Sequence, residues 1–389
     1  MPTGSTRAPD PNAARFAVRG RLVLDRGLVP GAVVVEGGRI AEVVLEPAPA
    51  ALPPTVHDAA IVSPGFIDLQ VNGGFGVEVG ERADAIARLA ARLPATGVTA
   101  FLPTLVSSAA EVYPRACQAF LASRGAAGAL PLGLHLEGPF LSLRRAGAHR
   151  TSAIENASPA VWDPFLEHDA LRLVTLAPEL EGALEHIQRL RQQRVVVSLG
   201  HTDASYEEFR RGIDAGATMV THLFNAMSGF RPRAPGAVGA ALLDERVTVG
   251  VIADGVHSHP ASLRLAVRVK GPDKVALVTD AIAGAGMEPG RYQLGGQDIL
   301  VKDGQARLPD GTLAGSVLSL DEAVRNVVSW AETGVGEACR MASEVPARLL
   351  GLRSKGRLAV GCDADLVLLD DALRVRATFR EGRSLYRAT

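Results

Sequence analysis

Aromatic residues are scarce in this sequence, at 4% of its 389 positions, and the formal net charge at pH 7 is only -1. Proteins that bind nucleic acid need cationic side chains for the phosphates and commonly use aromatic rings as stacking platforms. We therefore expect no nucleic-acid partner. No uninterrupted apolar run approaches the ~20 residues that cross a bilayer, so we expect no membrane partner either.

Cysteine is also rare, and Cys117, Cys339 and Cys362 lie far apart in the sequence. None belongs to the CxxC or CxxH spacing of a zinc knuckle or a redox pair. We expect three buried thiols in a reducing compartment, the cytoplasm. Residues 1–15 are rich in Pro, Ala and polar groups and lack the apolar core of a signal peptide, which predicts a disordered tail.

Short apolar runs and amphipathic stretches alternate through residues 63–353. Short apolar strands alternating with helices indicate a parallel sheet covered on both faces. Eight such units predict a TIM-like (β/α)8 barrel, the catalytic domain. The expected strands are GFIDLQVN, GVTAFLPT, LPLGLHLEGP, LRLVTLAPE, VVVSLGHT, MVTHLFNA, VTVGVIADG and VALVTDA.

The two ends of the chain have a different pattern. Residues 16–62 and 354–389 carry short β-like runs broken by Gly and Pro, which is typical of a small antiparallel sheet. We predict that they form one small β-sandwich domain into which the barrel is inserted. Two segments interrupt the alternation of strands and helices in the barrel. We expect the first, SGFRPRAPGAVGAALL, to be a long loop. The second is the Gly-rich, hairpin-like stretch that follows the eighth strand.

The active site of such a barrel lies at the carboxyl ends of its strands. Taken singly, a histidine there is commonly a hydrogen-bonded core residue, and an aspartate is often a helix cap. Here many polar residues gather at the predicted strand ends, which favours a functional site. They are Gln70, Asn72, His135, Glu137, His201, His222, Asn225, Asp254, His257 and Asp280.

Glu137, His201 and His222 end the third, fifth and sixth predicted strands. Two imidazoles and one carboxylate are the ligand set of a catalytic divalent metal ion with one position left open. Zinc suits this set best, although iron, cobalt or manganese also accept it. Asp280 ends the eighth strand and is a candidate general base that would later act as a general acid. The alternatives are that Asp280 is a fourth metal ligand or caps a helix. All four lysines lie away from the strand ends, which excludes a carboxylated lysine between two metals.

The corner PGFID, the GH and TH histidines, TDA and the closing GRLAVGCDADLVLLD resemble the amidohydrolase superfamily along nearly the whole chain. Within it, HLEGPFL, GAH, SLGHTDA, THLFNAM, IADGVH, LVTDA and TLAGS resemble the family of N-acetylglucosamine-6-phosphate deacetylases. The resemblance implies hydrolysis of N-acetylglucosamine 6-phosphate to acetate and glucosamine 6-phosphate, a step of amino-sugar catabolism or cell-wall recycling. Two alternatives stay open, another amidohydrolase acting on a non-phosphorylated amide and a non-catalytic sugar-phosphate sensor.

The resemblance also implies roles for single residues. Glu137, His201 and His222 would hold the metal ion, and Asp280 would take a proton from water and hand it to the departing amine. His149 in GAH would contact the substrate near the scissile carbonyl and stabilise the oxyanion. His135 shares a face with Glu137, and we expect it to support the site or pack against it.

The same resemblance implies how the sugar phosphate is bound. The phosphate would meet His257, the Asn225–Ala226 pair and an arginine that reaches in from the partner subunit of a homodimer. Arg233 is the expected arginine, with Arg231 as the alternative. The remaining positions implied to bind substrate are Ala148, Asp254, Leu313, Ala314 and Gly315.

Gln70 and Asn72 occupy a slot where many amidohydrolases carry two histidines that bind a second metal ion. Neutral amides are poor zinc ligands beside imidazole and carboxylate. We therefore predict one metal ion per active site, with the two amides orienting water or the groups around the metal. The alternative is that the amides only satisfy backbone groups at the barrel mouth.

Overall fold

The computed structural model describes residues 15–46, 52–154 and 169–389. The predicted tail, apart from Arg15, lies outside these ranges. Among the helices described, none is both long and apolar enough to cross a membrane. The three cysteines are buried free thiols, as predicted.

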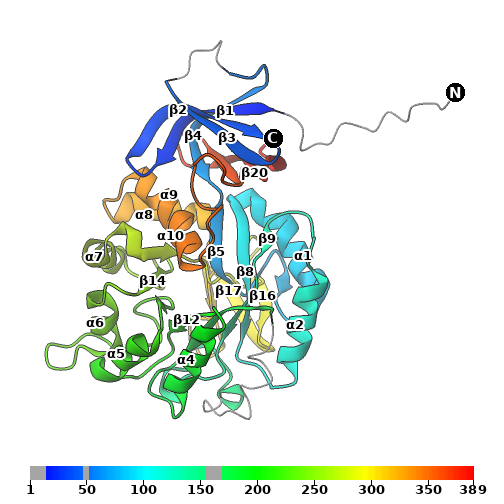
Figure 1. The fold of residues 1–389 in the computed structure, drawn as a ribbon. Coiled ribbons are helices and arrows are strands. Elements are labelled where there is room, and N and C mark those ends of the chain that lie inside the picture. The colour runs from blue at the N-terminus through cyan, green and yellow to red at the C-terminus, as the bar shows by residue number, and fades with distance from the viewer. Residues whose placement is uncertain (1–14, 47–51, 155–168) are drawn as a thin grey trace.

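A barrel of eight parallel strands forms the centre of the molecule (Figure 1) and confirms the predicted (β/α)8 architecture. Each strand pairs with the next along the chain, and the short β9 (Leu130–Pro131) adds to the second. The eight are β5 (Phe66–Val71), β8 (Val98–Val106), β10 (Leu134–Glu137), β11 (Leu171–Leu176), β12 (Val196–Leu199), β13 (Met219–Val220), β14 (Thr248–Val251) and β15 (Val275–Leu277).

The barrel closes between its first and last strands. Val71 bridges Ala281 in parallel, and the backbone N–H of Asp280 donates to the carbonyl oxygen of Gln70 at 2.9 Å. Beneath this seam the buried Asp68 carboxylate accepts a hydrogen bond from Thr279 Oγ1 at 2.6 Å. Burial raises the pKa of Asp68 to about 6 despite these hydrogen bonds. The closure places the end of β5 beside the residues that follow β15.

Helices surround the strands and bury their apolar faces against them. The amphipathic stretches between the predicted strands form helices, as expected for a (β/α)8 barrel. Among the described residues, the α-helices are α1 (Ala83–Arg92), α2 (Val112–Ala122), α4 (Ala183–Gln192), α5 (Tyr206–Ala215), α6 (Gly236–Leu243), α7 (Pro260–Lys270), α8 (Leu320–Trp330), α9 (Val335–Ala342) and α10 (Glu344–Leu349). Short 3-10 helices are η2 (Leu93–Thr96), η3 (Leu143–Arg145), η4 (Thr151–Ala153) and η5 (Pro272–Lys274).

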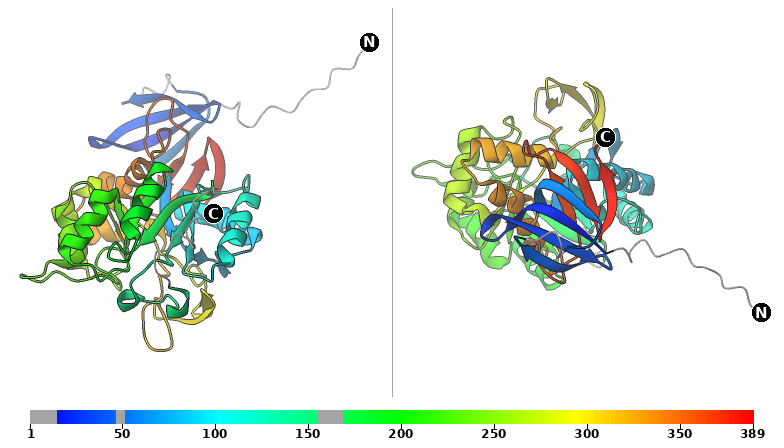
Figure 2. Two further views of the ribbon diagram at one scale, coloured as in Figure 1. Left: turned by 60° about the horizontal axis from the view of Figure 1, so that its bottom comes forward. Right: turned by 90° about the horizontal axis from the view of Figure 1, so that it is seen from above.

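The two interrupting segments fold differently from each other. The expectation of one long loop over SGFRPRAPGAVGAALL was wrong in its second half, which forms α6 because its alanines and leucines favour helix after Pro235. The Gly-rich stretch does form hairpins, and Figure 2 (left, yellow) shows it at the end opposite the terminal sheet. Its strands are β16 (Gly290–Leu294), β17 (Gln297–Lys302) and β18 (Gln305–Arg307), and nearby lies the small pair β6 (Gly73–Gly74) and β7 (Val77–Glu78).

Both ends of the chain build one sheet with its own hydrophobic cluster. Figure 2 (right) shows its blue N-terminal and red C-terminal strands side by side. The expected antiparallel pairing holds except between β1 and β4, which run parallel because β4 enters beside β1 on its way into the barrel. In spatial order the strands are β21 (Arg383–Arg387), β20 (Val375–Arg380), β19 (Leu366–Leu369), β4 (Val56–Pro64), β1 (Phe16–Leu24), β2 (Gly27–Glu36) and β3 (Arg39–Leu45).

Candidate active site

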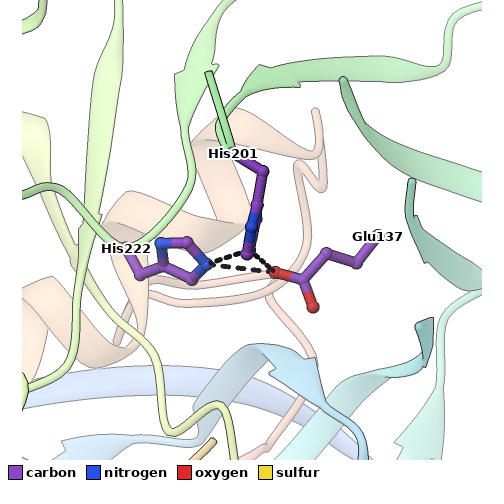
Figure 3. Close-up of side chains that lie close together, drawn as sticks. All are labelled: Glu137, His201 and His222. Carbon is purple, nitrogen blue, oxygen red and sulfur yellow. Dashed lines mark hydrogen bonds and ion pairs between the residues drawn. The ribbon is translucent and has the colours of Figure 1, made fainter. Parts of the chain in front are cut away.

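The three predicted metal ligands meet at the carboxyl ends of β10, β12 and β13 (Figure 3). Glu137 Oε1 lies 3.1 Å from His222 Nε2 and 3.4 Å from His201 Nε2. The two Nε2 atoms are 3.0 Å apart, and all three side chains are buried. One atom from each residue can therefore bind the same ion, as the sequence predicted.

The backbone at these positions is unusual. His201, His222 and Asp280 all have positive φ angles, of 48°, 26° and 52°. Non-glycine residues rarely adopt this region, and such strain is concentrated at functional sites. In each case the chain turns immediately after a strand, which aims the side chain into the mouth of the barrel.

His201 is held in one orientation by the loop that follows β10. Its Nδ1 donates a hydrogen bond to the carbonyl oxygen of Arg145 at 2.8 Å, which leaves Nε2 without a proton in the neutral ring. Arg145 in turn binds Asp203 through Nε at 2.9 Å, and the Asp203 backbone N–H donates to Glu179 at 2.7 Å. The loop and the ligand are thus tied together.

These donors fit a divalent cation. An unprotonated His201 Nε2 has a lone pair that can bind a cation shared with His222 Nε2, which lies 3.0 Å away. Burial alone would raise the pKa of Glu137, but the adjacent imidazoles of His201, His222 and His149 hold it well below its usual range. The carboxylate is therefore charged and available as a ligand.

Asp280 lies in the same centre and accepts two amide hydrogen bonds on one oxygen. Gln70 Nε2 donates to Oδ1 at 2.9 Å and Asn72 Nδ2 donates to it at 2.5 Å. Gln70 Nε2 also lies 2.9 Å from Glu137 Oε1, so it bridges the two carboxylates. Burial and the negative charge of Glu137 raise the pKa of Asp280 to about 7, the range in which a carboxylate can both accept and return a proton.

A cavity of about 350 Å³ opens over this centre. The predicted residues that line it are Asn72, Glu137, Ala148, His149, His201, His222, Asn225, Ala226, His257, Asp280, Leu313 and Gly315. A larger cavity of about 880 Å³ adjoins it at Val106 but contains none of the candidate metal ligands. The smaller cavity therefore connects the candidate metal ligands and Asp280 with the solvent.

Five predicted residues do not line the cavity. One of them, Gln70, is the amide that bridges Glu137 and Asp280. Asp254 instead accepts a hydrogen bond from His257 Nδ1 at 2.7 Å and so orients that ring. His135 lies deeper, where its Nε2 accepts a hydrogen bond from Thr175 Oγ1 at 2.8 Å and burial lowers its pKa to about 4. Ala314 is buried behind the wall, and Arg233 is exposed on the loop before α6.

Several residues at the site were missed from the sequence. Arg144, Arg145, Leu294 and Thr312 line the cavity. Ser107 contacts His149 from the end of β8. All of them belong to loops or hairpins whose approach to the barrel mouth has no periodic signal in the sequence.

The fold and the site together define a metal-dependent barrel hydrolase, and comparison with known proteins agrees. The Amidohydrolase family profile matches residues 61–385, and the chain belongs to that family. It is 42% identical over 345 residues to the N-acetylglucosamine-6-phosphate deacetylase of Mus musculus, covering 84% of each chain. It is 40% identical to the N-acetylgalactosamine-6-phosphate deacetylase of Escherichia coli O157:H7, over 87% of this chain and 91% of that protein.

Solved structures show the same likeness. A mutant of the N-acetyl-D-glucosamine-6-phosphate deacetylase of Mycobacterium smegmatis, in complex with N-acetyl-D-glucosamine-6-phosphate, aligns with a TM-score of 0.90 at 36% identity. The alignment covers 96% of this chain and all of the other. The likeness to that structure therefore includes both the barrel and the terminal sheet of this chain.

Proposed function

We propose that this protein hydrolyses the acetamide of N-acetylglucosamine 6-phosphate to acetate and glucosamine 6-phosphate. The observation that carries the proposal is the meeting of Glu137, His201 and His222 with Asp280 in one buried centre under an open cavity. The identities of 42% and 36% to named deacetylases support the choice of substrate. The three buried free thiols suit a reducing location, the cytoplasm.

The chain's own groups account for the movement of protons. A divalent ion held by Glu137, His201 and His222, which we propose to be one zinc per chain, would polarise the acetyl carbonyl and make water more acidic. Asp280 accepts a proton from the attacking water as oxygen bonds to the carbonyl carbon. It then gives that proton to the amine nitrogen as the C–N bond breaks.

The 6-phosphate is proposed to lie toward His257 and the Asn225–Ala226 turn. The His257 side chain is only 7% exposed, and it lines the wall of the cavity. Burial by itself lowers the pKa of His257, but Asp254 and Asp280 together raise it above its usual value. A cationic imidazole at this wall suits a phosphate dianion.

The proposal extends to a homodimer in which Arg233 completes the phosphate site of the other subunit. Arg233 is exposed and does not line the cavity of its own chain, and its loop stands away from the barrel beside Phe230, which is 60% exposed. Arg231 pairs with Ala234 across the turn at the loop tip. A cation on such a loop is placed to serve a neighbouring subunit.

Acetate release tests the reaction. Purified protein should release one acetate for each amine formed from N-acetylglucosamine 6-phosphate, and Asp280→Asn should lower kcat by about 100-fold or more. Chelation should abolish turnover and added zinc should restore it. Full activity of Asp280→Asn would refute the assigned base.

The substrate panel should include the unphosphorylated sugar and the C4 epimer, because the Escherichia coli relative acts, by its name, on N-acetylgalactosamine 6-phosphate. The proposal predicts that removal of the phosphate lowers kcat/KM by about 100-fold or more. Equal turnover without phosphate would favour a different amide substrate. Higher kcat/KM for the epimer would reassign the sugar and leave the chemistry intact.

Mixed dimers test the role of Arg233. Neither Arg233→Ala nor Asp280→Asn should turn over substrate well alone, but a mixture refolded or co-expressed together should recover about a quarter of wild-type activity, since one site per mixed dimer is complete. Arg231→Ala is the matched control and should stay active. No recovery in the mixture would contradict the shared site.

A further inference from the structure

Ser107 contacts the imidazole of His149 from a different element of the barrel. Ser107 directly follows β8, whereas His149 lies in the loop after β10. The Ser107 backbone N–H donates to His149 Nδ1 at 3.2 Å, and Ser107 Oγ lies 2.8 Å from the same nitrogen. Both residues are buried.

The backbone donor decides where the imidazole proton lies. A main-chain N–H can only donate, so the nitrogen that it meets must accept. In a neutral imidazole one ring nitrogen accepts and the other carries the proton. His149 Nδ1 therefore has no proton, and the proton is on Nε2.

The hydroxyl of Ser107 agrees with this assignment. Oγ lies 3.3 Å from the carbonyl oxygen of Glu137 and 2.8 Å from His149 Nδ1, and its single proton can be donated to either acceptor. Neither partner requires the hydroxyl to accept. A proton on Nδ1 could be accepted by Oγ, but it would leave the Ser107 N–H facing a protonated nitrogen in place of an acceptor.

The protonated Nε2 faces the buried centre of the site. It lies 3.7 Å from Glu137 Oε2, and the His149 ring stands edge-on to the ring of the ligand His201, with centroids 4.5 Å apart. His149 also lines the cavity. A donor in this place can reach an oxygen atom bound over the metal ligands.

We propose that Ser107 is a positioning residue that holds His149 as the Nε2–H tautomer, so that His149 donates a hydrogen bond to the acetyl carbonyl oxygen and does not act as a base. The identity of that oxygen rests on the proposed function, whereas the tautomer does not. The role of Ser107 follows from contacts that join β8 to the loop after β10.

The tautomer can be measured without substrate. In zinc-loaded enzyme with ¹⁵N-labelled imidazoles, long-range ¹H–¹⁵N correlation spectra should show His149 with a protonated Nε2 and a bare Nδ1. Its signals are identified among the nine histidines by their loss in His149→Gln. A proton on Nδ1, alone or together with one on Nε2, would overturn the proposal even if the enzyme is a deacetylase.

Side-chain replacements test the donor in turnover. A glutamine amide can place its N–H near Nε2, whereas an asparagine amide reaches only the position of Nδ1. His149→Gln should therefore keep a kcat about tenfold or more above that of His149→Asn. An equal or reversed order would overturn the donor role.

Ser107→Ala removes one of the two donors to Nδ1 and should lower kcat by about threefold to tenfold with little change in KM. Ser108→Ala is the matched control, because that hydroxyl donates to the Val106 carbonyl oxygen and does not touch His149. The control should keep wild-type kcat. Equal kcat in both variants, or a change in KM alone, would remove Ser107 from the proposal.

Failure to cleave any N-acetylhexosamine 6-phosphate would reject the proposed function. The tautomer measurement would then decide the role of Ser107.

Discussion

Gln70 and Asn72 are oriented by the charges around them. Both amides donate to Asp280 Oδ1, and Gln70 also donates to Glu137, so a reversed amide would place its oxygen against a carboxylate. The amide oxygens are buried and have no hydrogen-bond partner among the described residues. Because Asp280 Oδ1 already accepts two hydrogen bonds, we infer that Asp280 Oδ2 is the proton acceptor.

The amide pair leads to a prediction about metal count. Elemental analysis of protein purified without chelator should find one divalent ion per chain, because amide donors replace imidazoles beside Glu137. The double variant Gln70→His and Asn72→His should bind about two. Two tightly held ions in the wild-type protein would contradict the single-metal site.

His257 leads to a prediction about pH. Burial lowers its pKa, but Asp254 and Asp280 raise it above the usual value, so more of the ring is cationic at a given pH and the charge is lost as pH rises through the raised pKa. KM for the phosphorylated substrate should therefore increase by about tenfold between neutral and alkaline pH. His257→Asn should show a high KM that no longer rises with pH. A wild-type KM that falls over this range would contradict a phosphate contact.

At the scale of elements, the short turns after the strands connect the site to the helices. Helix α5 begins shortly after the candidate ligand His201 and has a complete capping box. Ser205 Oγ accepts from the Glu208 N–H, and the Glu208 carboxylate accepts from the Ser205 N–H. Two otherwise unpaired backbone donors are thereby satisfied. The cap holds the segment that carries Asp203, which binds Arg145 in the facing loop.

Loss of this cap should be measurable as stability. Ser205→Ala should lower the free energy of unfolding by about 1 kcal/mol, seen as a lower urea midpoint. Ser329→Ala, at an exposed position inside α8, is the matched control and should leave the midpoint unchanged or slightly raised, since alanine favours helix. Equal shifts in both variants would show that the capping box contributes nothing.

At the scale of the whole molecule, a buried ion cluster joins the terminal sheet to the barrel. Lys355 Nζ lies 2.7 Å from Asp365 Oδ2 and 3.0 Å from Asp363 Oδ2. The Asp365 carbonyl oxygen accepts from the N–H of Gly65, the residue before β5. The C-terminal segment thus holds the first barrel strand where it leaves the sheet.

Removal of the cation should destabilise the protein in a pH-dependent way. Lys355→Met leaves the buried Asp365 carboxylate without a cation, whereas Asp363 keeps Arg39 at 3.6 Å, and should cost about 3 kcal/mol at pH 8. Burial already raises the pKa of Asp365, and loss of Lys355 raises it further, so the penalty should shrink as pH falls and the carboxylates gain protons. Lys302→Met, exposed on β17, is the control and should have little effect at either pH. A penalty that is the same at pH 5 and pH 8 would contradict this account.

Much of this architecture could be predicted because it depends on local patterns. The alternation of buried strands with amphipathic helices specifies a parallel barrel, and the barrel places strand ends at one mouth. Glu137, His201, His222 and Asp280 could be found for that reason, since each lies at the end of an apolar strand or within three residues after it. The helix α6 was missed because Gly and Pro residues at its start hid an eight-residue helical run.

The sequence by itself determined the barrel and picked out the candidate metal ligands and Asp280, because strand periodicity and strand ends are local properties. Only the tertiary structure decided which loops meet over the barrel mouth. Ser107 faces His149 and Arg145 faces His201 across more than 40 residues of sequence. Such contacts depend on how irregular loops pack and on the directions of single hydrogen bonds, and neither leaves a periodic signal in the chain.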